Sequence, residues 1–217
     1  MIITIDGPSG TGKSTVARLL AKKLGFHFFD TGALYRAFAW WLFSQNISLD
    51  RAKEGLASFV FRIGGNQEVK RYYVNEIDVT EDIRTKTITE AASSIARIKE
   101  VREDFLPIQR AFGRKYDSVF EGRDLGSVVF PDADKKFFLT ASPEVRAERR
   151  YKELLLKNVK EPLTKEEVFE DMQVRDHQDS SRKIAPLVCP EGAFLLDTSG
   201  LSAEEVVDSL INNLKQR

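Results

Sequence analysis

The sequence predicts an α/β protein in which a five-stranded parallel sheet is flanked by helices. Apolar β-type runs alternate with helical patterns along the chain, and this order is typical of parallel sheets. The first run, Ile2–Ile5, leads into a glycine-punctuated loop and then into a helix that begins near Lys13. With 217 residues the chain can bury one sizeable core, so we expect a single domain over 1–217.

Glycines in the first loop occur in the pattern of a phosphate-binding P-loop, between a strand and a helix. They let consecutive backbone N–H groups approach phosphate oxygens, and the helix N-terminus adds further donors. The pattern places Lys13 on the β- and γ-phosphates of ATP and the Ser14 hydroxyl on Mg²⁺. The expected ATP-binding residues are Gly7, Pro8, Ser9, Gly10, Thr11, Gly12, Lys13, Ser14 and Thr15.

The elements that follow continue the alternation. Gly25 ends the first helix, and Phe26–Asp30 is the second predicted strand. Thr31 and Gly32 then turn into a helix over 33–43. We therefore expect the second strand to lie parallel to the first.

The sequence pattern changes after residue 58, where short β-type runs follow one another without helical segments between them. The β-type runs at 59–63, 69–74 and 77–79 are separated by Gly64-Gly65-Asn66 and Asn75-Glu76, which favours a small antiparallel insert. The alternative is a surface hairpin without function. Residues 81–112 are mostly helical by composition, with Pro107 at a kink or at the first position of a helix.

The second half of the chain supplies the remaining strands and several marked helix starts. The predicted strands are Ser118–Asp124, Lys135–Thr140 and Phe194–Asp197. The helix starts are Ser142-Pro143, with an N-cap serine before proline, and the capping boxes Thr164–Glu167 and Ser202–Glu205.

Composition excludes several classes of partner. Lys+Arg and Asp+Glu are equal at 33 each, so no overall field draws the protein to nucleic acid or anionic lipid. Cys189 is the single cysteine, and this suits a reducing cytoplasm. Because a strand is predicted so close to Met1, we expect no signal peptide, and runs such as 37–43 are too short to span a bilayer. We expect a cytoplasmic monomer.

Polar residues follow four of the predicted strands, where ligands bind in open parallel sheets. These strand ends are Asp6-Gly7, Asp30-Thr31-Gly32, Glu121–Asp124 and Asp197-Thr198-Ser199. Arginines lie near them at Arg36, Arg123, Arg149 and Arg150. In a chain without net charge, this clustering points to a second anion besides ATP.

Arg175, Asp179 and Arg182 are spaced to share one face of a helix. Alone, they would indicate a solvated face with weak intrahelical ion pairs. Beside a P-loop, we favour a role around the transferring phosphoryl group, which needs positive charge.

Other P-loop classes lack their signatures here. The sequence has no Asn-Lys-x-Asp run for guanine recognition and no Leu-Ser-Gly-Gly transporter signature. The third strand ends in Val119-Phe120-Glu121 rather than in the apolar-Asp-Glu pattern of motor ATPases.

Four stretches carry a family resemblance: Ile3–Gly10, Asp30–Arg36, Glu121–Asp132 and Ser181–Leu187. They resemble the bacterial cytidylate kinases of the nucleoside-monophosphate kinase group. The resemblance implies a core of 1–35, 113–148 and 183–217. It also implies a monophosphate-binding lobe over about 36–112, which holds the insert, and a lid with its following helix over about 149–182.

Carried over by position, the resemblance assigns most of the polar residues to substrates. Ser93, Arg102 and Asp124 would read cytosine, and Arg36, Arg123 and Arg175 would hold the acceptor phosphate. Asp179 and Arg182 would face the pentose, Arg149 and Arg150 would begin the lid, and Asp197–Ser199 would lie near adenine. The resemblance also places Thr31 and Tyr35 among the substrate-binding residues. This sequence departs from the family pattern at two positions, where relatives often have Ser in place of Thr31 and Asp in place of Glu121.

The expected reaction transfers the γ-phosphoryl group of ATP to CMP or dCMP. The acceptor phosphate is already ionised at neutral pH, so catalysis is chiefly positioning and charge neutralisation. The expected catalytic residues are Lys13, Arg123, Arg149, Arg150 and Arg175. Mg²⁺ would lie on Ser14, with Glu121 holding its water shell.

The Asp124 carboxylate can accept from the exocyclic amine of cytosine but would face a carbonyl oxygen in UMP, which favours CMP. Two alternatives stay open. One is a kinase for another small acceptor, such as UMP, AMP or a non-nucleotide acid. The other is a nucleotide-binding switch without transfer, which leaves Arg36, Arg123, Arg175 and Arg182 unexplained.

Overall fold

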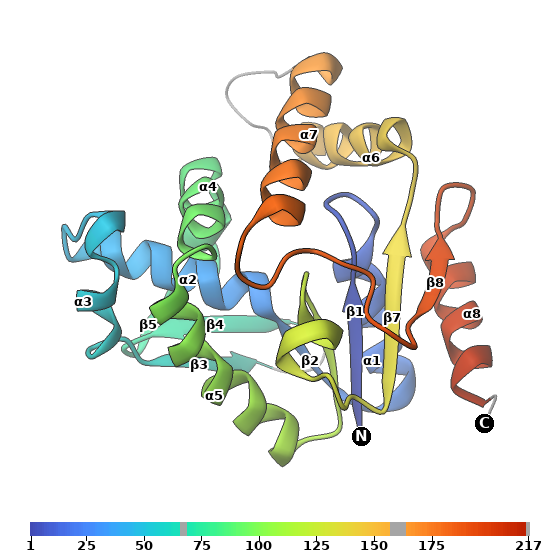
Figure 1. The fold of residues 1–217 in the computed structure, drawn as a ribbon, viewed down its shortest axis with the longest axis horizontal. Helices are drawn as coiled ribbons and strands as arrows, with labels where there is room; N and C mark the ends of the chain where they lie inside the picture. The colour runs from blue at the N-terminus through green and yellow to red at the C-terminus, as the bar shows by residue number, and fades with distance from the viewer. Residues whose placement is uncertain (66–68, 157–163, 216–217) are drawn as a thin grey trace.

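The computed structural model describes residues 1–65, 69–156 and 164–215. Its main sheet is formed by β1 (Ile2–Asp6), β2 (His27–Asp30), β6 (Ser118–Glu121), β7 (Lys135–Thr140) and β8 (Phe194–Asp197). The strands lie in the order β2-β6-β1-β7-β8, and every neighbouring pair is parallel. The predicted five-stranded parallel sheet is therefore confirmed, and its central strand carries the P-loop (Figure 1).

Helices cover both faces of this sheet. The α-helices of the described residues are α1 (Lys13–Leu24), α2 (Thr31–Ser44), α3 (Lys53–Leu56), α4 (Lys86–Ile95), α5 (Lys99–Lys115), α6 (Pro143–Leu156), α7 (Lys165–Ser181) and α8 (Ala203–Lys215). On one face, Ile3 and Ile5 of β1 pack with α1 and α8. On the other, Phe29 and Phe120 pack with the apolar side chains of α2 and α5. The alternation of side chains along each strand divides the core in this way.

Local capping signals start the helices where the sequence predicts them. Thr164 and Glu167 form the expected capping box of α7. The hydroxyl of Ser142 accepts the N–H of Val145 at the start of α6. Asp30 accepts the N–H of Ala33 and so begins α2 at Thr31, two residues earlier than the helical pattern indicated.

Pro107 lies inside α5, which excludes the second of its two predicted places, the first position of a helix. A proline inside a helix removes one backbone hydrogen bond. Val101 and Phe105 are fully buried before it, and Gln109 is buried after it. Burial on both sides of Pro107 outweighs the lost bond and carries the helix through.

The predicted antiparallel insert is also confirmed. It consists of β3 (Phe61–Gly65), β4 (Lys70–Val74) and β5 (Ile77–Asp78), paired in that order. Part of the first predicted turn, at 66–68, lies outside the described residues. Tyr72 and Val74 of β4 are buried in the same core cluster as α2, so the insert packs against the main body on that side (Figure 1).

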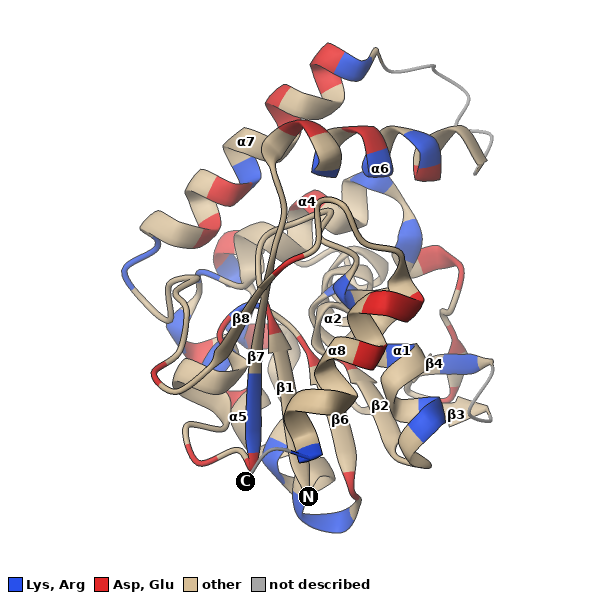
Figure 2. Ribbon diagram, turned by 90° about the vertical axis from the view of Figure 1, so that its right-hand side faces the viewer, with Lys and Arg blue, Asp and Glu red and all other residues tan. Residues whose placement is uncertain are grey.

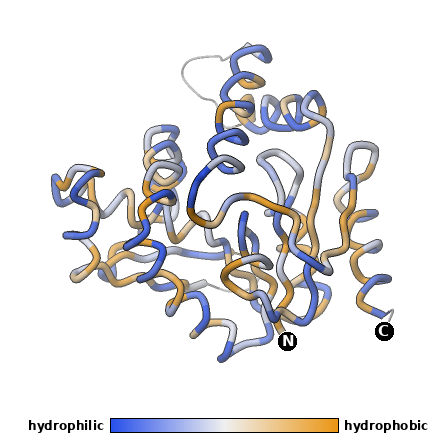
Figure 3. Tube along the Cα trace, in the orientation of Figure 1, coloured by the Kyte–Doolittle hydropathy of each residue, from blue (hydrophilic) through white to orange (hydrophobic). Residues whose placement is uncertain are grey.

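The helices α6 and α7 lie together beyond the carboxyl ends of the strands, at the end of the molecule opposite both termini (Figure 1). They are rich in charged side chains of both signs, and α7 is largely hydrophilic (Figures 2 and 3). The expected lid lies here, but its stretch at 157–163 falls outside the described residues. No helix in the described ranges is long and apolar enough to span a membrane.

Candidate functional site

A cavity of about 930 Å³ opens at the carboxyl ends of the strands. Its lining includes Ser9–Thr15 of the P-loop. The residues expected to bind the acceptor, to hold Mg²⁺ or to take part in catalysis also line it: Thr31, Tyr35, Arg36, Ser93, Arg102, Glu121, Arg123, Asp124, Arg149, Arg150, Arg175, Asp179 and Arg182. Side chains from widely separated parts of the chain therefore line one space, at the edge where the parallel strands end.

Gly7 and Pro8 are not among the described residues that line this cavity, although we expected both to bind ATP. Gly7 has φ +143°, and a Cβ there would lie 2.0 Å from the carbonyl oxygen of Leu139. Gly7 is thus required for close approach to β7. Gly10 and Gly12, with φ +77° and +87°, produce the turns of the P-loop itself.

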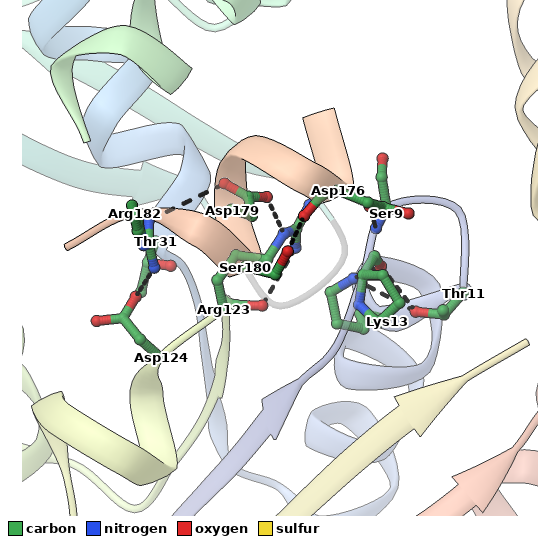
Figure 4. Close-up of polar contacts among 12 residues, drawn as sticks. Ser9, Thr11, Lys13, Thr31, Arg123, Asp124, Asp176, Asp179, Ser180 and Arg182 are labelled. Atoms are coloured by element: carbon green, nitrogen blue, oxygen red, sulfur yellow. Dashed lines mark hydrogen bonds and ion pairs between the residues drawn. The ribbon is translucent and has the colours of Figure 1, made fainter. Parts of the chain in front are cut away.

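Lys13 is 4% exposed, and its charge has no carboxylate partner among the described residues. Its ammonium group donates to the carbonyl oxygen of Pro8 and, at 3.3 Å, to Oγ1 of Thr11 (Figure 4). The pKa of Lys13 is lowered well below its usual value, mainly by burial and secondly by the positive charge of Arg123. A phosphate group placed here would offset both effects.

Ser14 and Glu121 bring two oxygen atoms together at the start of α1. The hydroxyl of Ser14 donates to Oε2 of Glu121 at 2.9 Å, and Oγ1 of Thr31 donates to the Glu121 carbonyl oxygen at 2.7 Å. The pKa of Glu121 is raised, mainly by burial and secondly by the negative charge of Asp30. Hydroxyl and carboxylate oxygens are ligands that Mg²⁺ accepts, and a nearby cation would favour the ionised form of Glu121.

Three arginines, Arg36, Arg123 and Arg175, line the same cavity as the P-loop. Arg36 pairs with Asp30 at 2.9 Å, and Nε of Arg123 donates to Oδ2 of Asp179 at 3.1 Å (Figure 4). Nε of Arg175 is buried and has no hydrogen-bond partner within the described residues. The pKa of Arg175 is lowered to about 10, mainly by burial and secondly by the positive charge of Arg123. An anion bound between these guanidinium groups would relieve their repulsion.

Asp124 joins residues from α5 and from the segment after α7. Its Oδ1 accepts from Arg182 at 3.0 Å (Figure 4), and its Oδ2 accepts from Arg102. Both carboxylate oxygens therefore have guanidinium partners, which the sequence did not reveal. Each ionised carboxylate can accept about four hydrogen bonds, so Asp124 retains capacity for a base.

The expectation that Arg182 shares a helix face with Arg175 was wrong. The helix α7 ends at Ser181, and Arg182 follows with extended backbone angles, φ −63° and ψ 139°. This extension turns the guanidinium towards Asp124, while its Nη1 stays 4.0 Å from Oδ1 of Asp179. Asp179 in turn pairs with Arg123 across the cavity rather than along its own helix.

Tyr35 and Ser93 complete the region around Asp124. The ring of Tyr35 lies 6.0 Å from the guanidinium carbon of Arg102, and burial raises the pKa of the Tyr35 hydroxyl to about 12. Ser93 lies on α4 and lines the same cavity. This end of the cavity is thus walled by an aromatic ring, a hydroxyl and an ion-paired carboxylate.

Arg149 and Arg150 are adjacent on α6 but have different partners. Arg149 donates to Oγ1 of Thr198 at 3.0 Å and to the carbonyl oxygens of Thr198 and Leu201 at 2.6 and 3.3 Å. It therefore fixes the loop after β8. Arg150 pairs with Glu153 at 2.9 Å and keeps a third of its side chain exposed, at 32%.

No sequence pattern indicates the direct link that the structure has between the P-loop and α7. The amide N–H of Ser9 donates to Asp176 at 3.2 Å (Figure 4), and Asp176 pairs with Arg146. Arg146 also donates to the carbonyl oxygen of Ser9 at 3.1 Å. The only available signal was that Asp176 follows Arg175 and that Arg146 precedes Arg149 by three positions.

Comparisons with known proteins identify the family of this chain. A family model described as cytidylate kinase matches residues 3–216. The chain belongs to the cytidylate kinase family. This kinase is 46% identical to a protein named cytidylate kinase from Protochlamydia amoebophila, covering 97% of this chain and 95% of the relative. It is 42% identical to a protein of the same name from Clostridioides difficile, covering 99% and 98%.

Solved structures resemble the kinase in fold. An uncharacterised protein from Eubacterium ventriosum aligns with a TM-score of 0.55 at 13% identity, covering 100% of this chain and 99% of the other. A shikimate kinase from Bacteroides thetaiotaomicron aligns with a TM-score of 0.50 at 12% identity, covering 99% and 98%. At such low identity these likenesses show only a shared α/β fold.

Proposed function

We propose that this member of the cytidylate kinase family transfers the γ-phosphoryl group of ATP to CMP or dCMP in the cavity described above. The observation that carries the proposal is that Arg36, Arg123 and Arg175 line the same cavity as the P-loop. ATP alone does not need this second group of cations. A monophosphate held between them would lie opposite the γ-phosphate of a nucleotide on the P-loop.

The P-loop amides of Ser9–Thr15 and the Lys13 ammonium hold the donor in this proposal. Ser14 would hold Mg²⁺ and Glu121 would order its hydration shell, because their oxygens lie within hydrogen-bond distance, at 2.9 Å. When bound, Mg²⁺ neutralises phosphate charge. Among the described residues no group of three or more His, Cys, Asp or Glu could bind a metal by itself, which fits a metal held largely by ATP.

The arginines hold the acceptor. Arg175 offers a buried Nε–H that has no partner within the described residues, and this donor suits a phosphate oxygen. Arg123 comes from the core and Arg175 from α7, so the acceptor phosphate would bridge two parts of the molecule. Arg149 and Arg150 add charge at the start of the lid, and Arg149 also fixes the loop that we place near adenine.

The base would be read by Asp124, Arg102 and Ser93, with Thr31 and Tyr35 beside them. The Asp124 carboxylate can accept from the cytosine amine, while UMP would present a carbonyl oxygen to it. Leaving buried polar groups unpaired costs ~1–3 kcal/mol each, so discrimination against UMP follows. Asp179 and Arg182 would contact the pentose.

A coupled assay that offers CMP, dCMP, UMP, AMP and GMP separately tests this proposal. We expect the highest kcat/KM with CMP or dCMP. Faster turnover of AMP than of CMP would overturn the cytosine assignment. ATP hydrolysis without any phosphorylated acceptor would favour the nucleotide-binding switch. A cytoplasmic monomer is part of the proposal, and sedimentation of the purified protein tests its oligomeric state.

A further inference from the structure

Asp6 ends β1 directly before the P-loop, and the transfer proposed above gives it no role. The residue is fully buried, at 0% exposed. Because side chains alternate along a strand, Asp6 lies on the same face of β1 as Thr4, away from Ile3 and Ile5. A π-helical turn, Leu125–Val129, covers this face, since a Cβ on Gly126 would lie 3.1 Å from Oγ1 of Thr4.

Both carboxylate oxygens of Asp6 bind this turn. Oδ1 accepts the amide N–H of Leu125 at 2.9 Å, and Oδ2 accepts the amide N–H of Gly126 at 2.8 Å. These are consecutive amides at the start of the turn, where backbone N–H groups have no carbonyl partner within it. The preceding Asp124 makes no side-chain cap to the turn. Asp6 therefore supplies the acceptors that the turn needs.

The position of Asp124 depends on this attachment. Asp124 is covalently next to Leu125, and its own carboxylate receives Arg102 and Arg182. Without the two Asp6 hydrogen bonds, the start of the turn would lose its attachment to the end of β1, and the neighbouring backbone of Asp124 could shift. The two guanidinium groups would then be free to draw the Asp124 carboxylate into a different position.

The P-loop is less dependent on the Asp6 carboxylate, although Gly7 follows it directly. The path of Gly7 is set by its close contact with the carbonyl oxygen of Leu139. The tip of the loop is held separately by Asp176 and Arg146. A change confined to the Asp6 carboxylate should thus affect the acceptor side of the cavity more than the ATP side.

We propose that Asp6 is a positioning residue for the acceptor nucleotide. Its carboxylate fixes the start of the π-helical turn and so holds Asp124 in the orientation that reads the base. This inference rests on the proposed function of the cavity. On this inference, β1 positions both the ATP site and the acceptor site. The P-loop follows its last residue, and the side chain of that residue, Asp6, binds the segment next to Asp124.

The test compares Asp6→Asn with a matched change, Thr4→Val. The Asp6→Asn side chain keeps its size but replaces one acceptor oxygen with an NH₂ group that faces a backbone N–H. The Thr4→Val change alters the same face of β1 and removes a buried hydroxyl that has no hydrogen-bond partner in the described part of the chain. KM values for CMP and for ATP, and kcat, are measured at about pH 8.

We expect Asp6→Asn to raise the KM for CMP about 10-fold or more and the KM for ATP less than about 3-fold. Thr4→Val should leave both within about 3-fold of the unchanged protein. An unaltered KM for CMP in folded Asp6→Asn overturns the inference. An equal rise of both KM values also overturns it, because it would mean general loosening of the strand end.

Two further results keep the inference separate from its premises. If Asp6→Asn does not fold, amide hydrogen exchange in the unchanged protein decides: fast exchange at Leu125 and Gly126 would show that the two bonds are not maintained. If the unchanged protein phosphorylates another monophosphate instead of CMP, the proposed substrate fails. The same comparison of KM values is then made with that acceptor, and it still decides the role of Asp6.

Discussion

The amide N–H of Ser9, at the tip of the P-loop, donates to Oδ1 of Asp176 on α7 at 3.2 Å. Asp176 and Ser9 are also joined through Arg146, which pairs with the carboxylate and donates to the Ser9 carbonyl oxygen at 3.1 Å. Both backbone groups of Ser9 are thereby fixed by side chains of α6 and α7. A Cβ on Gly10 would lie 2.7 Å from Cε of Met172, so α7 also packs directly on the loop.

Replacing Asp176 by Asn should weaken the hold on the P-loop. Hydrogen bonds to charged groups contribute ~1.5–3 kcal/mol, and we expect kcat/KM for ATP to fall about 10-fold. Asp171→Asn is the control, since Asp171 lies on the same helix with 59% of its side chain exposed. Equal kinetics for the two variants in a steady-state assay would show that the link to Ser9 does not matter for turnover.

Replacing Lys13 by Ala should abolish transfer with every acceptor. Loss of one group that stabilises transition-state charge costs about 10²–10³ in kcat, and the P-loop lysine contacts the phosphates directly. Lys23→Ala serves as the control because it removes an exposed cation near the other end of the same helix. Single-turnover measurements with radiolabelled ATP would detect residual transfer, and a rate near that of the unchanged protein would contradict the P-loop assignment.

Replacing Asp124 by Asn should impair use of CMP far more than binding of ATP. We expect the KM for CMP to rise about 100-fold, because the variant loses charge on the group that reads the amine. It also leaves Arg102 and Arg182 without their shared carboxylate, so the free energy of unfolding should fall by roughly 3–5 kcal/mol.

Equal losses of CMP use and ATP affinity in Asp124→Asn would argue against base reading. Asp132→Asn, with an exposed carboxyl group a few residues further along the chain, provides the comparison. Isothermal titration of each variant with CMP and with an ATP analogue separates the two affinities. Urea unfolding of the same samples separates loss of stability from loss of binding.

The buried Asp6 carboxyl should make stability depend on pH. Burial raises its pKa from 3.8 to about 7, despite the two backbone N–H donors and the charge of Lys13, which lower it, while the charge of Asp124 adds to the rise. Between about pH 4 and pH 7 the folded state retains a proton that the unfolded state has lost, so this group makes stability fall as the pH rises. The difference of about three pKa units corresponds to roughly 4 kcal/mol.

Asp6→Asn removes this titration. The free energy of unfolding of the variant, relative to that of the unchanged protein, should therefore increase steadily from pH 4 to pH 7. Urea unfolding at several pH values in this range measures the difference. Parallel pH profiles for the two proteins would mean that Asp6 does not carry a raised pKa.

Much of this architecture could be predicted from local sequence. The capping box at Thr164 and Glu167 and the P-loop glycines are short patterns whose conformations follow from neighbouring residues. Pro107 shows the limit of such patterns, because buried contacts on both sides kept α5 continuous through it. Arg182 shows another limit: the regular spacing from Arg175 suggested a helix face, but the helix ended one residue earlier.

The sequence alone therefore determined the succession of strands and helices along the chain and the P-loop. It also determined that arginines and carboxylates lie at the strand ends. These depend on periodicity, capping and glycine geometry, which act over a few residues. Only the tertiary structure decided which polar groups meet: Asp124 with both Arg102 and Arg182, Asp179 with Arg123, Asp176 with the amide of Ser9, and Asp6 with the amides of the turn after Asp124. These partners lie far apart along the chain, and a charged residue can pair with any opposite charge that folding brings near, so no local pattern specifies its partner.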